Sequence, residues 1–159
     1  MACYWKFGDD VKGEVTAEGH KDEMEVQSLS WGANRSVSNP HGTATNREGA
    51  VPMVSELNIA RQMDKASLKL FEDVLYGTFK RESTFTMTTT ASGSPVDYVQ
   101  YILENSGLAS YSVGAGADGV PQESMTISFT KMTYKFKPVA SDGSGDFGSA
   151  DIDLTTMKK

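Results

Sequence analysis

Residues Val96–Leu103 alternate as a β-strand would, but both faces of that strand are apolar. One face consists of Val96, Tyr98 and Ile102, and the other consists of Val99, Tyr101 and Leu103. Such a strand must be covered on both sides, because neither face gains from contact with water. The fold must therefore supply two covering layers, either from the same chain or from another copy of it.

Most of the remaining chain also shows the period-two patterning of short strands. The expected strands span residues 3–7, 24–31, 53–59, 84–90, 108–113, 123–136 and 152–154. The apolar face switches between Val26 and Leu29, and it shifts again near Lys131. A switch of face disturbs the register of a strand, so the first position requires a bulge or cover on both faces, and a bulge or bend is expected near Lys131.

One segment, Asp64–Gly77, has the three-to-four spacing of an amphipathic helix, with its regular part at about 65–76. Asp64 is placed to cap the first turn, and Gly77 suits the left-handed position that ends many helices. The apolar stripe consists of Leu68, Phe71 and Leu75, with Leu70 and Val74 beside it. A single helix cannot cover every apolar strand face, so we expect neighbouring subunits to cover the rest.

The order of the elements indicates the fold class. Many short strands with one helix and no alternation of strand and helix predict a mainly β domain, an antiparallel β-barrel or sandwich over residues 1–159. The longest irregular stretch, about 33–52, is rich in asparagine, proline and glycine. A loop of that length in a compact domain is expected to be either functional or disordered.

Composition excludes several classes of partner. The net charge of −6 disfavours binding to nucleic acid and to anionic membrane surfaces. The single cysteine, Cys3, excludes an internal disulfide and fits a reducing cytosol. We find no signal-peptide pattern at the start and no apolar run of membrane-spanning length. We therefore expect no nucleic-acid partner and no membrane insertion.

The search for catalytic and metal-binding residues finds no strong candidate. His20 lies among acidic residues, where a packing histidine is the simple interpretation and a pH sensor or metal ligand the alternative. Cys3 in a strand is expected to be a small buried hydrophobe rather than a nucleophile. The run Gly114–Gly119 lacks the lysine and the following helix of a phosphate loop, so we interpret it as a hairpin. We expect no catalytic residue, no metal and no cofactor.

Five segments together resemble the Hcp (haemolysin-coregulated protein) family, the tube protein of bacterial type VI secretion. These segments are Gly8–Glu14, Met24–Gly32, Met63–Ser67 before a helix that ends in Tyr76-Gly77, Val96–Leu103 and Glu123–Phe129. The resemblance implies a β-barrel with one flanking helix that assembles into hexameric rings. Such rings stack into the inner tube that a contractile sheath ejects together with a spike protein.

The resemblance also implies partners and a destination. Small effector proteins bind in the ring lumen of some family members. The protein is then expected to be made in the bacterial cytoplasm and secreted without a signal peptide, to the extracellular space or into a target cell. The role is structural, so the chain is not expected to be an enzyme.

The resemblance assigns roles to a few residues. Ser30, the serine before Trp-Gly, would face the lumen and contact cargo, although an ordinary polar strand residue is the alternative. Thr86 and Thr88, on the all-threonine face of 84–90, are further candidates for the lumen lining. The loop at 33–52 contributes to ring stacking in the family, and its candidate residues here are Asn39, Pro40, His41 and Arg47.

Three other functions stay open from sequence. The chain could be a phage-tail-tube-like subunit of another contractile injection device, or a monomeric β-barrel that binds a small ligand. A hydrolase with a catalytic triad assembled in space is the third. A mass measurement in solution separates an assembled ring from a monomeric barrel.

Overall fold

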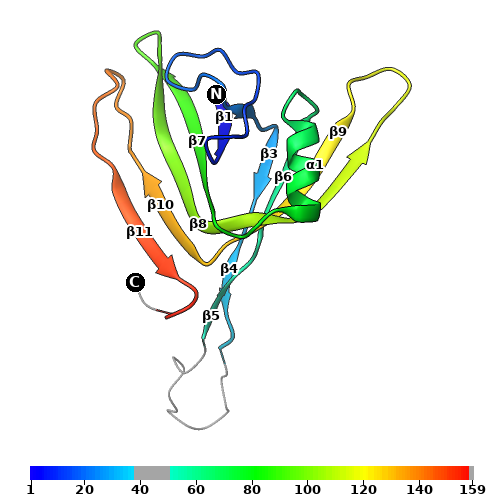
Figure 1. Cartoon of the computed structure of the whole chain (residues 1–159). Helices are drawn as coiled ribbons and strands as arrows, with labels where there is room; N and C mark the ends of the chain where they lie inside the picture. Colours follow the sequence, from blue (N-terminus) through cyan, green and yellow to red (C-terminus); the bar gives the residue numbers. More distant parts are fainter. Residues whose placement is uncertain (38–50, 158–159) are drawn as a thin grey trace.

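The computed structural model describes residues 1–37 and 51–157, which form a curled nine-stranded antiparallel sheet, a separate two-stranded ribbon and a single helix (Figure 1). The elements are β1 Ala2–Phe7, β2 Met24–Glu25, β3 Ser28–Ser30, β4 Ala33–Arg35, β5 Pro52–Val54, β6 Leu57–Gln62, α1 Ser67–Tyr76, β7 Arg81–Ala91, β8 Ser94–Gly114, β9 Gln122–Ser128, β10 Lys131–Phe136 and β11 Gly148–Asp153. The strands follow the order β2-β1-β7-β8-β9-β6-β3, and β10 with β11 branches from β8. The predicted mainly β fold with one flanking helix is confirmed.

Strand β8 holds the two halves of this sheet together. Its 21 residues pair with β7 and β10 in the first half and with β9 in the second. Two separate strands, 96–103 and 108–113, were expected here, and that expectation is wrong. The chain bends at the junction without leaving the ladder, because Asn105 adopts a positive φ of 50°. Gly107 then leaves room for the ring of Phe79, which a Cβ atom would approach to 2.6 Å.

The core lies inside the curl. Trp5 stacks on Phe85 with ring centroids 5.5 Å apart, and both are fully buried. The inward face of β8, which consists of Val99, Tyr101 and Leu103, is buried with them as the alternation predicts. The predicted second apolar face of this strand is wrong, because the register shifts at Tyr98 between the pairs Met87–Val99 and Thr88–Asp97. Tyr98 contacts the ring of Phe136, whose pairing partner is the inward-facing Val99, and it packs against the core.

At both positions where the apolar face switches, the structure has a break between two strands. Residues 24–31 divide into β2, which pairs with β1, and β3, which pairs with β6. Residues 123–136 divide into β9 and β10, which pair with different halves of β8. The switch of apolar face is real in both cases, but its cause is a change of partner strand rather than an inserted residue.

The expected strand at 53–59 also divides, and the expected loop at 33–52 begins and ends in regular structure. Strands β4 and β5 pair from Ala33 opposite Val54 to Arg35 opposite Pro52. They form a two-stranded projection, called the arm below, which comprises the described residues 33–37 and 51–54. The arm extends away from the body of the sheet at the end opposite the N-terminal loop (Figure 1).

The helix begins later than predicted and buries a different face. It starts at Ser67, and Asp64 supports the preceding turn by accepting the Ala66 N–H at 2.8 Å. The predicted apolar stripe is exposed, with Leu68 at 77%, Phe71 at 48% and Leu75 at 54%. The buried face consists of Ser67, Leu70 and Asp73.

Two polar residues occupy that buried face because the fold supplies partners for them. Arg81 Nε donates to Asp73 Oδ1 at 2.9 Å, and the Ser67 hydroxyl accepts the Asp64 N–H at 3.0 Å. Gly77 ends the helix with a φ of −70°, so its expected left-handed role is wrong. Glycine is required there because a Cβ atom would lie 2.3 Å from the Asp73 carbonyl oxygen.

Candidate functional site

Four neighbouring strands present a continuous outer face of small uncharged side chains, called the serine face below. The strand register aligns two rows across β3, β6, β9 and β8, namely Ser30–Asn58–Thr126–Ser110 and Ser28–Ala60–Ser124–Ser112. The face is hollowed, with a cavity of about 270 Å³ lined by these residues. A third row, Gln62–Gln122–Gly114, continues it without a charge.

The serine face follows from strict alternation along each strand. On β6, Leu57 and Ile59 point into the core, so Asn58 and Ala60 point outward. On β9, Met125 and Ile127 point inward in the same way. The alternation of serine with apolar residues at 110–113 and 122–128 is visible in the sequence. The strand order that joins these segments into one face is not visible there, and these residues were missed.

The chemistry of this face is weak and uniform. The Thr126 hydroxyl donates to Asn58 Oδ1 at 2.9 Å, and the other hydroxyls can exchange hydrogen bonds with any polar surface. Hydrogen bonds made in exchange for water contribute little net binding energy, and no charge in the rows adds to them. Such a face can touch a polar protein surface without holding it tightly.

Ser30 lies in the serine face and is exposed, whereas Thr86 and Thr88 have only 4% of their surface exposed. Both threonines lie on β7, where Thr86 is paired with Tyr4 of β1 and Thr88 is paired with Asp97 of β8. His20 stacks on the Tyr4 ring at 4.4 Å and places Nε2 3.0 Å from Asp97 Oδ1. The histidine thus joins the register neighbours of Thr86 and Thr88, Tyr4 and Asp97, and the burial of the two threonines does not favour their predicted place in a lumen lining.

His20 is a packing residue in this structure, as its simple interpretation predicted. It is 8% exposed, and its Nδ1 lies 2.9 Å from Glu23 Oε2, opposite the contact to Asp97. Within the described part of the chain, no group of three metal-ligating side chains is present. Cys3 is half-buried, and burial raises the pKa of its thiol to about 11, which suits a small hydrophobe better than a nucleophile.

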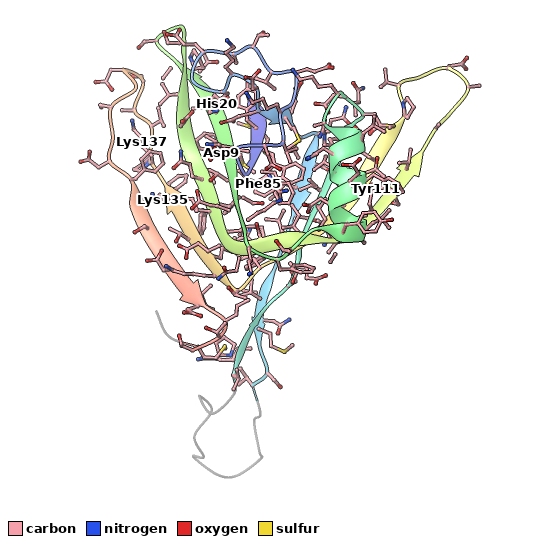
Figure 2. All side chains as sticks on the ribbon, viewed as in Figure 1. Asp9, His20, Phe85, Tyr111, Lys135 and Lys137 are labelled. Atoms are coloured by element: carbon pink, nitrogen blue, oxygen red, sulfur yellow. The ribbon has the colours of Figure 1, made fainter. Side chains whose placement is uncertain are left out.

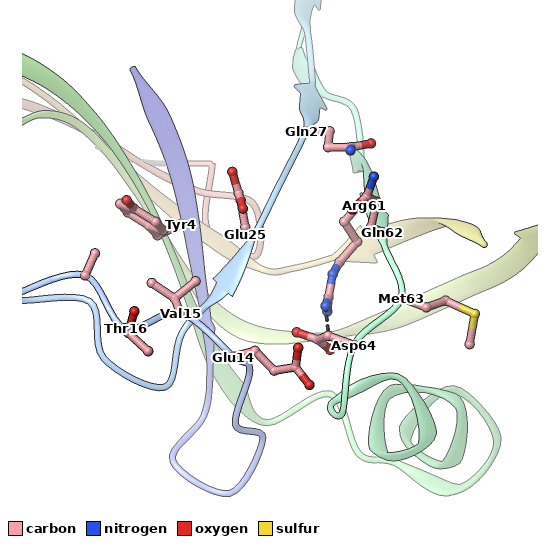
Figure 3. Close-up of a pocket in the computed structure, with 11 residues that line it drawn as sticks. Tyr4, Glu14, Val15, Thr16, Glu25, Gln27, Arg61, Gln62, Met63 and Asp64 are labelled. Atoms are coloured by element: carbon pink, nitrogen blue, oxygen red, sulfur yellow. Dashed lines mark ion pairs between the residues drawn. The ribbon is translucent and has the colours of Figure 1, made fainter. Parts of the chain in front are cut away.

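A larger cavity of about 550 Å³, called the rim pocket below, adjoins the serine face at the far end of β6 (Figure 3). Its lining combines apolar groups with four charged side chains, namely Tyr4, Val15, Met63, Glu14, Glu25, Asp64 and Arg61. Gln62 belongs both to this lining and to the third row of the serine face. The rim pocket therefore adjoins the serine face at Gln62.

A buried charge network forms one wall of the rim pocket. Arg61 is 1% exposed and pairs with Asp64, while its Nε lies 3.4 Å from Oε1 of the fully buried Glu123. The Tyr111 hydroxyl donates to Glu123 Oε2 at 2.8 Å. Burial, and then this hydrogen bond, raise the pKa of Tyr111 to about 12. In the sequence, the only sign of this network is one charged residue in each of two strands, Arg61 in β6 and Glu123 in β9.

This network leaves the mouth of the rim pocket acidic. The charge of Arg61 is balanced by Asp64 and Glu123, while Glu14 and Glu25 are both exposed at the mouth. Among the described residues, no basic side chain lies within ion-pair distance of either glutamate. A cationic group is the natural complement of this opening.

The predicted stacking residues Asn39, Pro40, His41 and Arg47 lie outside the described residues. The arm is described up to residue 37 and from residue 51. None of the helices in the described segments is long and apolar enough to cross a membrane.

Comparisons with known proteins agree on one family. The sequence profile described as "Type VI secretion system effector, Hcp" matches residues 4–136. A solved structure titled "Structure of a type six secretion system protein" superposes with a TM-score of 0.88 at 26% identity, covering 99% of this chain and 98% of the other. No curated protein sequence matches the chain.

Two further solved structures share the fold. Hcp1 from Salmonella typhimurium has a TM-score of 0.75 at 24% identity, covering 99% of this chain and 96% of its own. A type VI secretion system effector from Yersinia pestis has a TM-score of 0.72 at 22% identity, covering 95% and 98%. At these identities the likeness supports the arrangement of strands and not the role of single residues.

Proposed function

The chain belongs to the Hcp family of type VI secretion and is a structural tube subunit, and we propose that its serine face lines the lumen of a hexameric ring. The observation that carries the proposal is the serine face itself, two aligned rows of small uncharged side chains across four strands. A channel that passes varied proteins needs a hydrated wall whose hydrogen bonds to any one of these proteins are weak. Ser30 is the residue of this wall expected to contact cargo.

The apolar surface left exposed in one chain supplies a ring interface. One patch is the face of β10 that carries Tyr134 and Phe136, 37% and 47% exposed, next to the edge strand β11. The other is the helix stripe of Leu68, Phe71 and Leu75. The two patches lie on opposite sides of the molecule, as Lys135 on β10 and Tyr111 near α1 mark in Figure 2.

Two different patches on opposite sides form a heterologous contact, which generates a ring when its rotation closes. The β10 patch of one subunit then covers the helix stripe of the next, and edge strand β11 is no longer free to pair with unrelated chains. Six such contacts complete the hexamer.

The tube built from these rings acts mechanically and needs no catalytic group. A contractile sheath surrounds it, a spike protein caps it, and small effector proteins travel in its lumen out of the producing bacterium. The family match favours type VI secretion over a tail tube of another injection device.

The ring is tested by native mass spectrometry of the full chain and of Phe71→Glu. Wild type is expected as a hexamer, and the variant as a folded monomer, because a carboxylate at the stripe would be buried without a partner. Glu72→Lys, the neighbouring exposed position on the same helix, is the control and should stay hexameric. A wild-type monomer at micromolar concentration would contradict the proposal and favour a monomeric ligand-binding barrel.

Cargo contact is tested separately with Ser30→Gln. The longer side chain narrows the serine face, so retention of a co-expressed effector by the ring should fall. Ser141→Gln, in an exposed loop away from that face, is the matched control. Equal retention by both variants would remove Ser30 from the contact.

A further inference from the structure

The rim pocket lies between two walls that come from distant parts of the chain. Tyr4, Val15 and Glu25 belong to the N-terminal wall, and Arg61 and Met63 belong to the wall at the end of β6 (Figure 3). Each wall combines apolar surface with a charged group. A ligand that fills the space between them therefore meets both kinds of contact at once.

Hydrogen bonds from the backbone join the two walls at both ends of the pocket. The Gln27 N–H donates to the Ala60 carbonyl at 2.9 Å, and the Lys65 N–H donates to Glu14 Oε1 at 3.3 Å. The pocket is therefore formed before a ligand enters. Its volume of about 550 Å³ lies within the usual range of ligand sites.

The aromatic part of the N-terminal wall is fixed by a residue outside the pocket. His20 stacks on the Tyr4 ring, with centroids 4.4 Å apart. The two ring nitrogens of His20 lie 2.9 Å and 3.0 Å from carboxylate oxygens of Glu23 and Asp97. A tyrosine held in this way offers an apolar surface to a methylene chain and a favourable neighbour to a cation.

Two acidic side chains at the mouth of the pocket attract a cation. Glu14 and Glu25 are exposed, and neither lies within ion-pair distance of a basic side chain among the described residues. Because both carboxylates remain close to water, the attraction is moderate and is weakened by salt. A cation bound there can leave again.

The buried guanidinium of Arg61 sets a second requirement. It is 1% exposed, and its Nη1 has no hydrogen-bond partner among the described groups. Its charge is already balanced by Asp64 and Glu123, so the missing acceptor is a neutral oxygen rather than another anion. A diamine has no such oxygen, and a free amino acid brings a carboxylate. A lysine within a peptide has both the cation and a neutral carbonyl.

We propose that the rim pocket binds a lysine side chain in an extended segment of an effector protein carried by the tube. The ammonium lies between the two glutamates, the methylenes pack against the apolar walls, and a main-chain carbonyl accepts the Arg61 Nη1–H. The inference rests on the proposed function, because the pocket adjoins the serine face at Gln62 and so lies beside the path of cargo. The serine face treats cargo alike, whereas this pocket selects segments with a lysine.

A short peptide tests the pocket directly. The probe is acetyl-Gly-Ser-Lys-Ser-Gly-amide, and its control carries an acetylated lysine, which keeps the stem but loses the charge. Saturation-transfer NMR at low salt should show the lysine peptide binding the full-length chain more tightly. Glu14→Gln and Glu25→Gln should each weaken it about two- to fivefold, because each removes one exposed ion pair. Glu18→Gln, exposed in the same loop but outside the pocket lining, should bind as wild type does.

Equal binding of the two peptides would overturn the inference. An equal loss in Glu18→Gln would also overturn it, since that result indicates general attraction to an acidic chain. Pentylamine, which has the cation and the stem without a carbonyl, should bind more weakly than the peptide. If it binds equally well, the ligand is a simple amine and not a peptide segment.

Carbodiimide coupling gives an independent location, because it joins an ammonium and a carboxylate that touch. Peptide mass spectrometry should find the probe on Glu14 or Glu25 of the wild type and not on Glu18. Coupling spread over exposed acidic residues would contradict the site. Rings of the double variant Glu14→Gln with Glu25→Gln should also retain less of a co-expressed effector than wild-type rings. Unchanged retention would overturn the assignment of the lysine to cargo.

Native mass spectrometry of the same samples separates the two proposals. A wild-type hexamer that binds no lysine peptide would refute the pocket and leave the ring intact. A wild-type monomer that binds the peptide through Glu14 and Glu25 would contradict the proposed function and leave the chemistry of the pocket intact.

Discussion

Replacing Arg61 with methionine tests the charge network behind the rim pocket. The guanidinium faces a fully buried carboxylate, Glu123, and a second one at Asp64. Methionine fills a similar volume but leaves Glu123 buried beside apolar groups. Removing one partner of a buried ion pair costs about 3 to 5 kcal/mol. Asp64 lies nearer the surface and adds little to this cost.

The matched second change is Glu123→Gln. It keeps an acceptor for the Tyr111 hydroxyl, which donates at 2.8 Å, but removes the charge. Alone it should cost about 1 to 3 kcal/mol. In the Arg61→Met background it should instead recover about 2 kcal/mol, because the unpaired charge is gone. The two positions are therefore expected to be strongly non-additive.

Urea unfolding at one fixed protomer concentration measures these differences, since assembly makes apparent stability depend on concentration. An unchanged m-value with a shifted midpoint indicates a change in stability alone. A loss below about 1 kcal/mol for Arg61→Met would mean that the pair is well solvated or easily replaced. A double variant no better than Arg61→Met would equally refute the account.

Three further predictions concern backbone, pH and thiol chemistry. Gly107→Ala should cost about 1 to 3 kcal/mol in urea unfolding, because its Cβ would meet an aromatic ring at 2.6 Å, while Gly116→Ala, which meets open space, should be nearly neutral. The hydrogen bond from Arg81 lowers the pKa of Asp10, so this pair should stabilise the fold above about pH 4 and lose its effect as pH falls further; a Tm equally acid-sensitive in Arg81→Ala would contradict this. Cys3, with its pKa raised to about 11, should react with iodoacetamide at pH 8 far more slowly than in urea, and equal rates would show an open site.

The alternation of apolar residues was enough to predict which segments are extended and which face of β8 points inward, but not where the strands begin and end. It could not predict which strand pairs with which, because the period-two pattern is identical for every partner. The breaks at residues 26–27 and 129–130 therefore looked like bulges. The serine face was missed for the same reason, since its rows exist only once β3, β6, β9 and β8 are aligned.

For the helix, the sequence pattern could not predict which face is buried. The period identifies an apolar stripe but not what covers it, and the stripe of Leu68, Phe71 and Leu75 faces outward. The fold buries Asp73 instead, because Arg81 is positioned to neutralise it. A stripe that its own chain leaves uncovered is costly for a monomer. The exposure of this stripe, which the sequence predicted to be buried, therefore supports a contact with a neighbouring subunit.

The distribution of charge supports the same conclusion. The chain carries a net charge of −6, yet none of that charge lies in the two rows of the serine face. Exposed strand faces of a soluble monomer normally mix charges to prevent association. Here charge is absent from the serine face and present at its rim, where Glu14 and Glu25 can select a cationic partner. A face without charge is the arrangement expected of a channel wall that must release the proteins that pass along it.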